Sequence, residues 1–203
     1  MTQEPIIDPA DLDINIVNVV ATASLDQKIN LLDIMKAFRN VEYRPKQFPG
    51  LVFRLKKPKT ATLIFRSGKM VCTGAKSETM ARRAINKVVC ELINKEIIVL
   101  GEPKIVIQNM VASANLHRKI DLEMAAAVLD NVMYEPEQFP GLIYRMQDPK
   151  TVLLLFSTGK LVCTGAKSKE TVYESVTQLN GVLRDYDLLF EERANNSTRY
   201  RSE

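Results

Sequence analysis

A five-residue sequence that occurs twice sets the strongest limit on how this chain folds: Gln47-Phe48-Pro49-Gly50-Leu51 returns as Gln138-Phe139-Pro140-Gly141-Leu142. The copies are offset by 91 residues, and the same offset aligns residues 14–77 with residues 105–168 without a gap. More than half of the aligned positions are identical. Such a unit is longer than the repeats of solenoids and propellers, which span about 20 to 50 residues. We therefore expect two copies of one domain-sized unit, related by a pseudo-two-fold axis.

The composition is that of a soluble globular protein, with 46% apolar and 26% charged residues among 203. The net charge of +4 is unevenly distributed. Residues 1–102 carry 16 Lys and Arg against 11 Asp and Glu, whereas residues 103–203 carry 12 against 13. A weak excess of positive charge does not by itself require a nucleic-acid partner, so the positions of the basic residues matter more than their number.

The termini and the cysteines exclude several classes of protein. Residues 1–13 are acidic and lack the basic start and apolar core of a signal peptide, and no apolar run is long enough to cross a membrane. Cys72 and Cys163 are equivalent by the repeat, Cys90 is alone, and there is no Cys-x-x-Cys pair. We therefore expect reduced intracellular thiols and no structural metal.

Two helices are expected in each copy. Asn30 can cap a helix that ends near Phe38 and carries Leu31, Ile34 and Met35 on the same face as Phe38. The other helices are expected over residues 78–94, 122–129 and 169–184, with Ser77, Asp121 and Ser168 as their caps.

Short strands separated by turns make up the rest of each copy. A β-branched run over residues 14–22 predicts the first strand, and residues 51–55, 60–65 and 69–73 predict three more. Their connections are so short that only an antiparallel meander is possible. Helices segregated on one face of such a sheet make an α+β fold. The expected segments are an acidic tail over 1–13, repeats over 14–102 and 103–190, and a disordered polar tail over 191–203.

One face of this sheet lacks an evident cover. Because side chains alternate along a strand, Val17, Val19 and Ala21 are expected to face the helices while Asn18 and Val20 face away. The uncovered face also receives Leu63, Phe65, Val71, Thr73 and their copies, and its rim contains Arg54, Lys59, Lys69 and Lys76. An apolar face with a basic rim indicates a binding surface. The alternative is that the face is buried against the other repeat or a second chain.

The chain resembles the TATA-box-binding protein family. The resemblance rests on Phe48-Pro49-Gly50-Leu51, on the run from Phe65 to Lys76, and in the second copy on Tyr144-Arg145-Met146. It covers about residues 14–190, and the run Thr-Gly-Ala-Lys-Ser, in register with two phenylalanines and an asparagine, is highly specific. It implies a saddle: one curved antiparallel sheet with helices on its convex face and the DNA minor groove against its concave face.

The resemblance also implies a role for individual residues. Asn18 and Asn109 would donate hydrogen bonds to adenine N3 and thymine O2, the acceptors that A·T pairs present in the minor groove. The wedges between base steps would be Phe48, Phe65, Phe139 and Phe156. The remaining groove surface would consist of Val20, Leu63, Val71, Thr73, Val111, Leu154, Val162 and Thr164. The contacts to phosphates would come from Arg54, Lys59, Lys69, Lys76, Arg145, Lys150, Lys160 and Lys167.

The two copies differ in charge before each first phenylalanine, with Arg44-Pro45-Lys46 in one and Glu135-Pro136-Glu137 in the other. The resemblance implies that Glu135 and Glu137 bind general transcription factor B, through which RNA polymerase is recruited. The alternative is that both turns only carry solvated charge. The short chain, without a Gln-rich N-terminal extension, is similar to archaeal members, which act in the cytoplasm; a eukaryotic member would act in the nucleus.

Nothing in the sequence indicates an enzyme. The only histidine, His117, is expected to be solvated, and there is no Gly-rich phosphate loop or nucleophile motif. We expect a monomeric promoter-binding factor that needs no cofactor. One alternative is a divergent paralogue that uses the same saddle at other DNA sequences. Another is a tandem α+β domain that binds a small apolar ligand, which requires a pocket with converging titratable groups.

Overall fold

The computed structural model describes residues 12–191. Most of the two predicted tails lies outside the described residues, and Leu12, within the first tail, is buried in the core. The helices are α1 (Leu31–Ala37), α2 (Glu78–Asn94), α3 (Leu122–Val128) and α4 (Lys169–Asp185). The strands are β1 (Asn15–Ser24), β2 (Val41–Tyr43), β3 (Leu51–Leu55), β4 (Thr60–Ile64), β5 (Lys69–Ala75), β6 (Lys104–Asn115), β7 (Lys119–Ile120), β8 (Val132–Met133), β9 (Leu142–Met146), β10 (Thr151–Leu155), β11 (Lys160–Ala166) and β12 (Leu189–Phe190).

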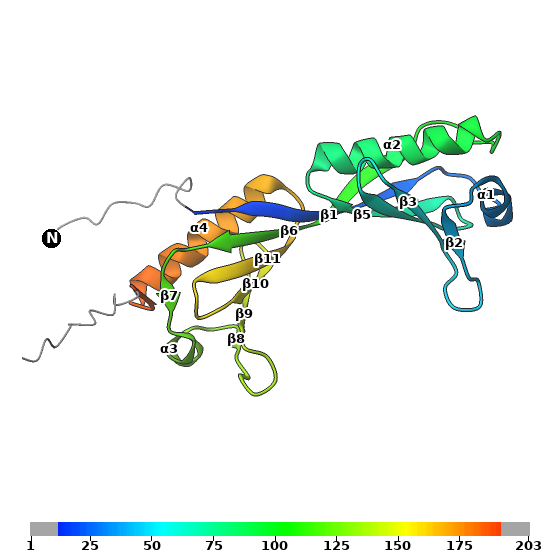
Figure 1. The fold of residues 1–203 in the computed structure, drawn as a ribbon. Coiled ribbons are helices and arrows are strands. Elements are labelled where there is room, and N and C mark those ends of the chain that lie inside the picture. Colours follow the sequence, from blue (N-terminus) through cyan, green and yellow to red (C-terminus); the bar gives the residue numbers. More distant parts are fainter. Residues whose placement is uncertain (1–11, 192–203) are drawn as a thin grey trace, which may run out of the picture.

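Ten strands, from both repeats, join in one antiparallel sheet in the order β2-β3-β4-β5-β1-β6-β11-β10-β9-β8, and β12 pairs with β7 in a separate two-stranded sheet. The first repeat forms one half of the sheet and the second repeat the other (Figure 1). At the centre, Val19 of β1 pairs with Met110 of β6. These residues are equivalent by the 91-residue offset, so the pseudo-two-fold axis passes through this pair.

The helices lie on one face of the sheet, as predicted. Helix α2 packs against β5 and β1, and α4 packs against β11 and β6. The loops between β2 and β3 and between β8 and β9 project away from α2 at the two ends of the sheet (Figure 1). The predicted α+β fold of two tandem repeats is therefore confirmed. None of the helices within residues 12–191 combines the length and apolar content needed to span a bilayer.

The predicted helices and caps are confirmed, with one error in the helix faces. The side chains of Asn30, Ser77, Asp121 and Ser168 each accept a hydrogen bond from a backbone N–H in the first turn, a contact that stabilises a helix by about 1 kcal/mol. The prediction that Met35 faces the core is wrong, because its side chain is 42% exposed. Helix α1 is rotated so that the Ile34 edge of its apolar stripe is buried and the Met35 edge faces solvent.

The four predicted strands of the first repeat are observed as β1, β3, β4 and β5, with ends that differ by at most two residues. Strands β2, β7, β8 and β12 were not predicted. Each has only two or three residues, which is too short for an alternating pattern to appear.

Strand β1 is bent by bulges, and this corrects the prediction for Val17. The register between β1 and β6 shifts between Ile16 and Asn18, so Val17 has no direct partner on β6. A bulge re-aims a side chain and bends the strand, and Val17 is 44% exposed instead of facing the helices. Further shifts occur between Val20 and Ala21 in this ladder and between β11 and β6. The bulges are thus concentrated in the central strands of the sheet.

The core lies between the sheet and the helices. Val19 and Ala21 are fully buried there, as predicted. Cys72 and Cys163 are also fully buried, which confirms that they are small core residues. Burial raises the pKa of both thiols, that of Cys163 to about 11, so they remain protonated and unreactive at neutral pH.

Candidate nucleic-acid interface

The sheet face opposite α2 and α4, here called the concave face, carries the predicted apolar residues. Along the strands they alternate with buried residues. The helices cover the buried residues, whereas the predicted residues lie on the opposite face and are half-buried. The two repeats contribute side by side to this face and do not cover each other. The predicted residues that it brings together are Val20, Leu63, Phe65, Val71, Thr73, Val111, Leu154, Phe156, Val162 and Thr164.

Two asparagines flank the pseudo-two-fold axis in matching hydrogen-bond networks. Asn18 Oδ1 accepts from the backbone N–H of Gly74 at 2.7 Å, and Asn18 Nδ2 lies 3.2 Å from Thr73 Oγ1. Asn109 Oδ1 likewise accepts from the N–H of Gly165 at 2.8 Å. The backbone donor fixes which end of each amide is the oxygen. Each Nδ2 carries two protons, so one donor remains for a ligand on the concave face.

An aromatic pair lies at each end of the concave face. The ring centroids of Phe48 and Phe65 are 5.8 Å apart at an interplanar angle of 65°, and those of Phe139 and Phe156 are 5.9 Å apart at 66°. Phe48 and Phe139 are 39% and 37% exposed. A Cβ atom on Gly50 would lie 2.6 Å from the Phe48 ring. Glycine in the Pro-Gly turn is therefore required for the close approach of this ring to the chain.

The loops that present Phe48 and Phe139 have the same backbone and opposite charge. The carbonyl of Arg44 accepts from the backbone N–H of Phe48 at 2.9 Å, and the carbonyl of Glu135 accepts from that of Phe139 at 2.9 Å. Glu135 and Glu137 are exposed. Because the loops share the same backbone hydrogen bonds, they differ in surface charge and not in backbone structure.

The predicted basic residues are exposed, but their surroundings differ between the repeats. Arg54 Nε lies 3.3 Å from Glu42 Oε1, and the repeat places Met133 at the position of Glu42, so Arg145 has no equivalent of this ion pair. The exposed lysines are Lys59, Lys69, Lys76, Lys150, Lys160 and Lys167. Lys76 and Lys167 directly precede the caps of the long helices.

Two equivalent hollows lie beside Phe65 and Phe156. One, of about 600 Å³, is lined by Phe65 and Lys104, and the other, of about 670 Å³, by Phe156 and Asp13. Lys104 and Asp13, which the 91-residue offset relates, were not predicted as site residues from the sequence. The same is true of Gln108, which occupies the bulge position equivalent to Val17 and donates to Thr22 Oγ1 at 2.8 Å.

Comparison with known proteins identifies the family. The family model described as transcription factor TFIID (or TATA-binding protein, TBP) matches residues 13–95 and again residues 104–186. A TATA-box-binding protein of Sulfurisphaera tokodaii is 52% identical over 194 residues, which are 95% of this chain and 98% of the relative. One from Pyrodictium occultum is 57% identical over 165 residues, 81% of this chain and 83% of the relative. The solved structure of Methanococcus jannaschii TBP matches with a TM-score of 0.79 at 47% identity, over 85% of this chain and 98% of that one. This chain therefore belongs to the TATA-box-binding protein family of transcription factors.

Proposed function

We propose that this protein binds the minor groove of A·T-rich promoter DNA with its concave face, bends the DNA by inserting phenylalanines, and recruits general transcription factor B and, through it, RNA polymerase. The observation that carries the proposal is the orientation of Asn18 and Asn109, whose amide donors lie at the centre of a curved apolar face. Exposed aromatic pairs lie at both ends of that face. Minor-groove proteins combine polar readers with apolar wedges in this way, and this family is itself a reference example.

Selection for A·T pairs follows from the chemistry of the concave face. The minor groove of an A·T pair presents only acceptors, whereas a G·C pair adds the guanine amino group. Val71 and Val162 are half-buried on the concave face. Their methyl groups accept no hydrogen bond, so a guanine amino group placed against them loses its water without gaining a partner. The six lysines would meet phosphates, which position the protein without reading sequence.

A G·C pair placed opposite Val71 or Val162 should weaken binding by about 1–3 kcal/mol, the usual cost of one mismatched pair. An inosine·cytosine pair keeps the G·C ring arrangement but lacks the amino group, so it should restore most of the affinity. The measurement is a fluorescence-anisotropy titration of the three duplexes at one salt concentration, because phosphate contacts make the affinity salt-dependent. Equal binding of the G·C and inosine·cytosine duplexes would falsify minor-groove selection by these valines.

The acidic loop should serve a basic protein partner. Phosphates repel Glu135 and Glu137, yet both lie beside the turn that presents Phe139. Reversing both charges, Glu135→Lys with Glu137→Lys, should therefore weaken the binding of factor B to the protein–DNA complex, mainly through a slower association rate. Binding to DNA alone should stay equal or become slightly tighter, because the repulsion is removed.

A supershift titration on one promoter measures both effects. The matched control is the opposite reversal in the first repeat, Arg44→Glu with Lys46→Glu, in a loop of the same backbone. This control should weaken DNA binding and leave the affinity of the complex for factor B unchanged. If factor B bound the Glu135 and Glu137 variant as well as the wild type at low salt, the acidic loop would be solvated surface only.

A further inference from the structure

The two central strands each carry a bulge residue next to a central asparagine. Val17 precedes Asn18 on β1, Gln108 precedes Asn109 on β6, and the 91-residue offset relates the two bulge residues. Neither of them has a partner residue in the pairing of β1 with β6, and both are exposed. The same backbone position therefore presents an apolar side chain in the first repeat and an amide in the second.

The Gln108 side chain lies on the concave face. Its Nε2 donates to Thr22 Oγ1 at 2.8 Å. Thr22 pairs with Val71, and residues that lie directly opposite each other in neighbouring strands share one face of the sheet. With Nε2 turned to Thr22, no residue in the described part of the chain donates to the side-chain oxygen, Oε1. An amide oxygen has two lone pairs, so Gln108 carries an unused acceptor beside Asn109.

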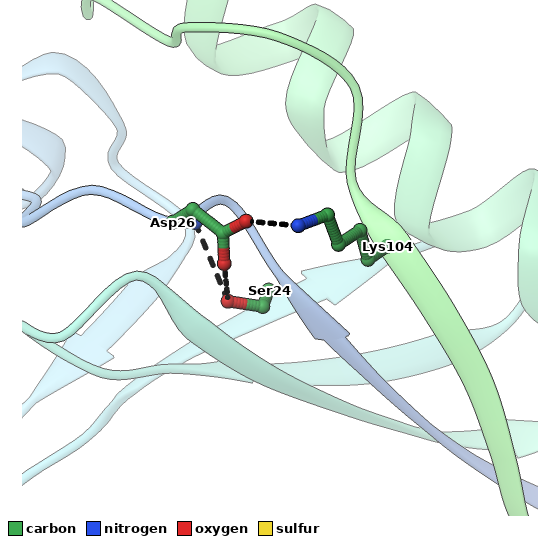
Figure 2. Close-up of polar contacts among 3 residues, drawn as sticks. All are labelled: Ser24, Asp26 and Lys104. Atoms are coloured by element: carbon green, nitrogen blue, oxygen red, sulfur yellow. Dashed lines mark hydrogen bonds and ion pairs between the residues drawn. The ribbon is translucent and has the colours of Figure 1, made fainter.

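Two charged residues of the neighbouring hollows, Lys104 and Asp13, already have partners. Lys104 donates to Asp26, which also accepts from the Ser24 hydroxyl at 2.9 Å (Figure 2). Asp13 Oδ2 lies 2.9 Å from His117 Nε2. His117 is thus exposed but paired, which corrects the expectation that it is merely solvated. Both basic side chains contact carboxylates, and neither donates to a bulge residue.

We propose that Gln108 contacts the minor groove beside Asn109 and admits a guanine there, whereas Val17 excludes guanine at the symmetry-related position. This inference rests on the proposed binding of DNA by the concave face. The guanine amino group is the one donor that base pairs present in the minor groove, and Gln108 Oε1 can accept from it while Nε2 stays bonded to Thr22. The second Nε2 proton can serve an adenine or thymine acceptor. A valine offers no acceptor, so a guanine amino group placed against it loses water without gaining a partner.

The test uses a palindromic A·T-rich element with one G·C pair at the same distance on each side of its centre. Such an element presents one guanine to each bulge residue whichever way round the protein binds. The guanine penalty is the affinity for the same element with inosine·cytosine pairs divided by the affinity for the G·C element, because inosine lacks only the amino group. Moving the two pairs outward from the centre in step locates the positions that face the bulges.

Four proteins should give a graded result at these positions. The wild type presents one glutamine and one valine. Gln108→Val presents two valines and should raise the guanine penalty about fivefold or more, the lower end of the usual cost of one mismatched pair. Val17→Gln presents two glutamines and should lower the penalty by a similar factor, since the new amide can bond to Ser113, the equivalent of Thr22. The exchange, Val17→Gln with Gln108→Val, should restore the wild-type penalty.

A glutamine outside the concave face provides the matched control. Gln178 is exposed on α4, so Gln178→Val should leave the guanine penalty unchanged at every position. If Gln108→Val weakened binding to the A·T, inosine·cytosine and G·C elements by one common factor, the glutamine would contact only the sugar–phosphate backbone, and the proposal would be overturned. A wild type that failed to bind the unsubstituted A·T element would instead overturn the proposed function, and the proposal with it.

Discussion

Replacing Phe139 with alanine should remove about half of the bend that the protein imposes on an A·T-rich duplex, and replacing Phe48 as well should remove most of it. An apolar wedge unstacks a base step and gains its contacts only in kinked DNA. The two aromatic pairs lie at opposite ends of the concave face, so each would kink one end of the element. The bend is measured by energy transfer between dyes at the two ends of the duplex.

The same substitution should change the stability of the fold little. Phe139 is 37% exposed and its aromatic contact is with Phe156, so its loss should lower the free energy of unfolding by clearly less than the loss of a fully buried phenylalanine, which costs about 3–5 kcal/mol. Phe53 is the control, because it is only 2% exposed and packs against Phe38 with ring centroids 4.9 Å apart. Phe53→Ala should cost about 3–5 kcal/mol of stability.

The two variants should thus show opposite patterns in two measurements. Phe139→Ala should bend DNA poorly and melt almost normally, whereas Phe53→Ala should melt early and, at temperatures where it is folded, bend DNA normally. A Phe139→Ala protein that melted early but bent DNA as the wild type does would place this ring in the core and not in the groove.

Much of the fold follows from local sequence patterns. The caps Asn30, Ser77, Asp121 and Ser168 were predicted because a capping side chain acts on a backbone N–H two or three residues away. The meander from β3 to β5 was predicted because its connections are too short for any other topology. The repeat then extended each local inference to the second copy, where the same elements are found.

The features that sequence reasoning missed depend on contacts between distant segments. The exposure of Val17 results from a bulge in its pairing with β6, and strict alternation cannot reveal a bulge. The contacts of Asp26 with Lys104 and of Asp13 with His117 join residues 78 and 104 positions apart. Both pairs appear only when the two repeats lie side by side. The sequence shows that Lys104 and Asp13 differ in charge, but it does not show that each of them lies beside a phenylalanine.

Substitution of a central asparagine by aspartate should have the largest effect on affinity of any single change at the concave face. In Asn18→Asp, one carboxylate oxygen can still accept from the Gly74 N–H, so that contact with β5 is kept. The other oxygen replaces the amide donor and faces the acceptors of the A·T minor groove. Leaving groove acceptors unpaired opposite a charged group should weaken binding by about 3 kcal/mol, roughly a hundredfold. Asn109→Asp should have a similar effect through Gly165.

A control must separate the lost donor from the added negative charge. Asn86→Asp adds the same charge on the exposed side of α2, away from the concave face, and should change affinity only slightly.

Repulsion between the new carboxylate and the phosphates also falls as salt is added, whereas an unpaired acceptor inside the groove is not relieved by salt. Comparing the DNA affinity of Asn18→Asp with that of the wild type at two salt concentrations therefore separates the loss caused by the missing donor from the loss caused by the added charge. A deficit that disappeared at high salt would mean that the asparagine contributes by being uncharged and not by donating a hydrogen bond. A deficit that persists would assign the reading of A·T pairs to the amide protons that Gly74 and Gly165 hold in position.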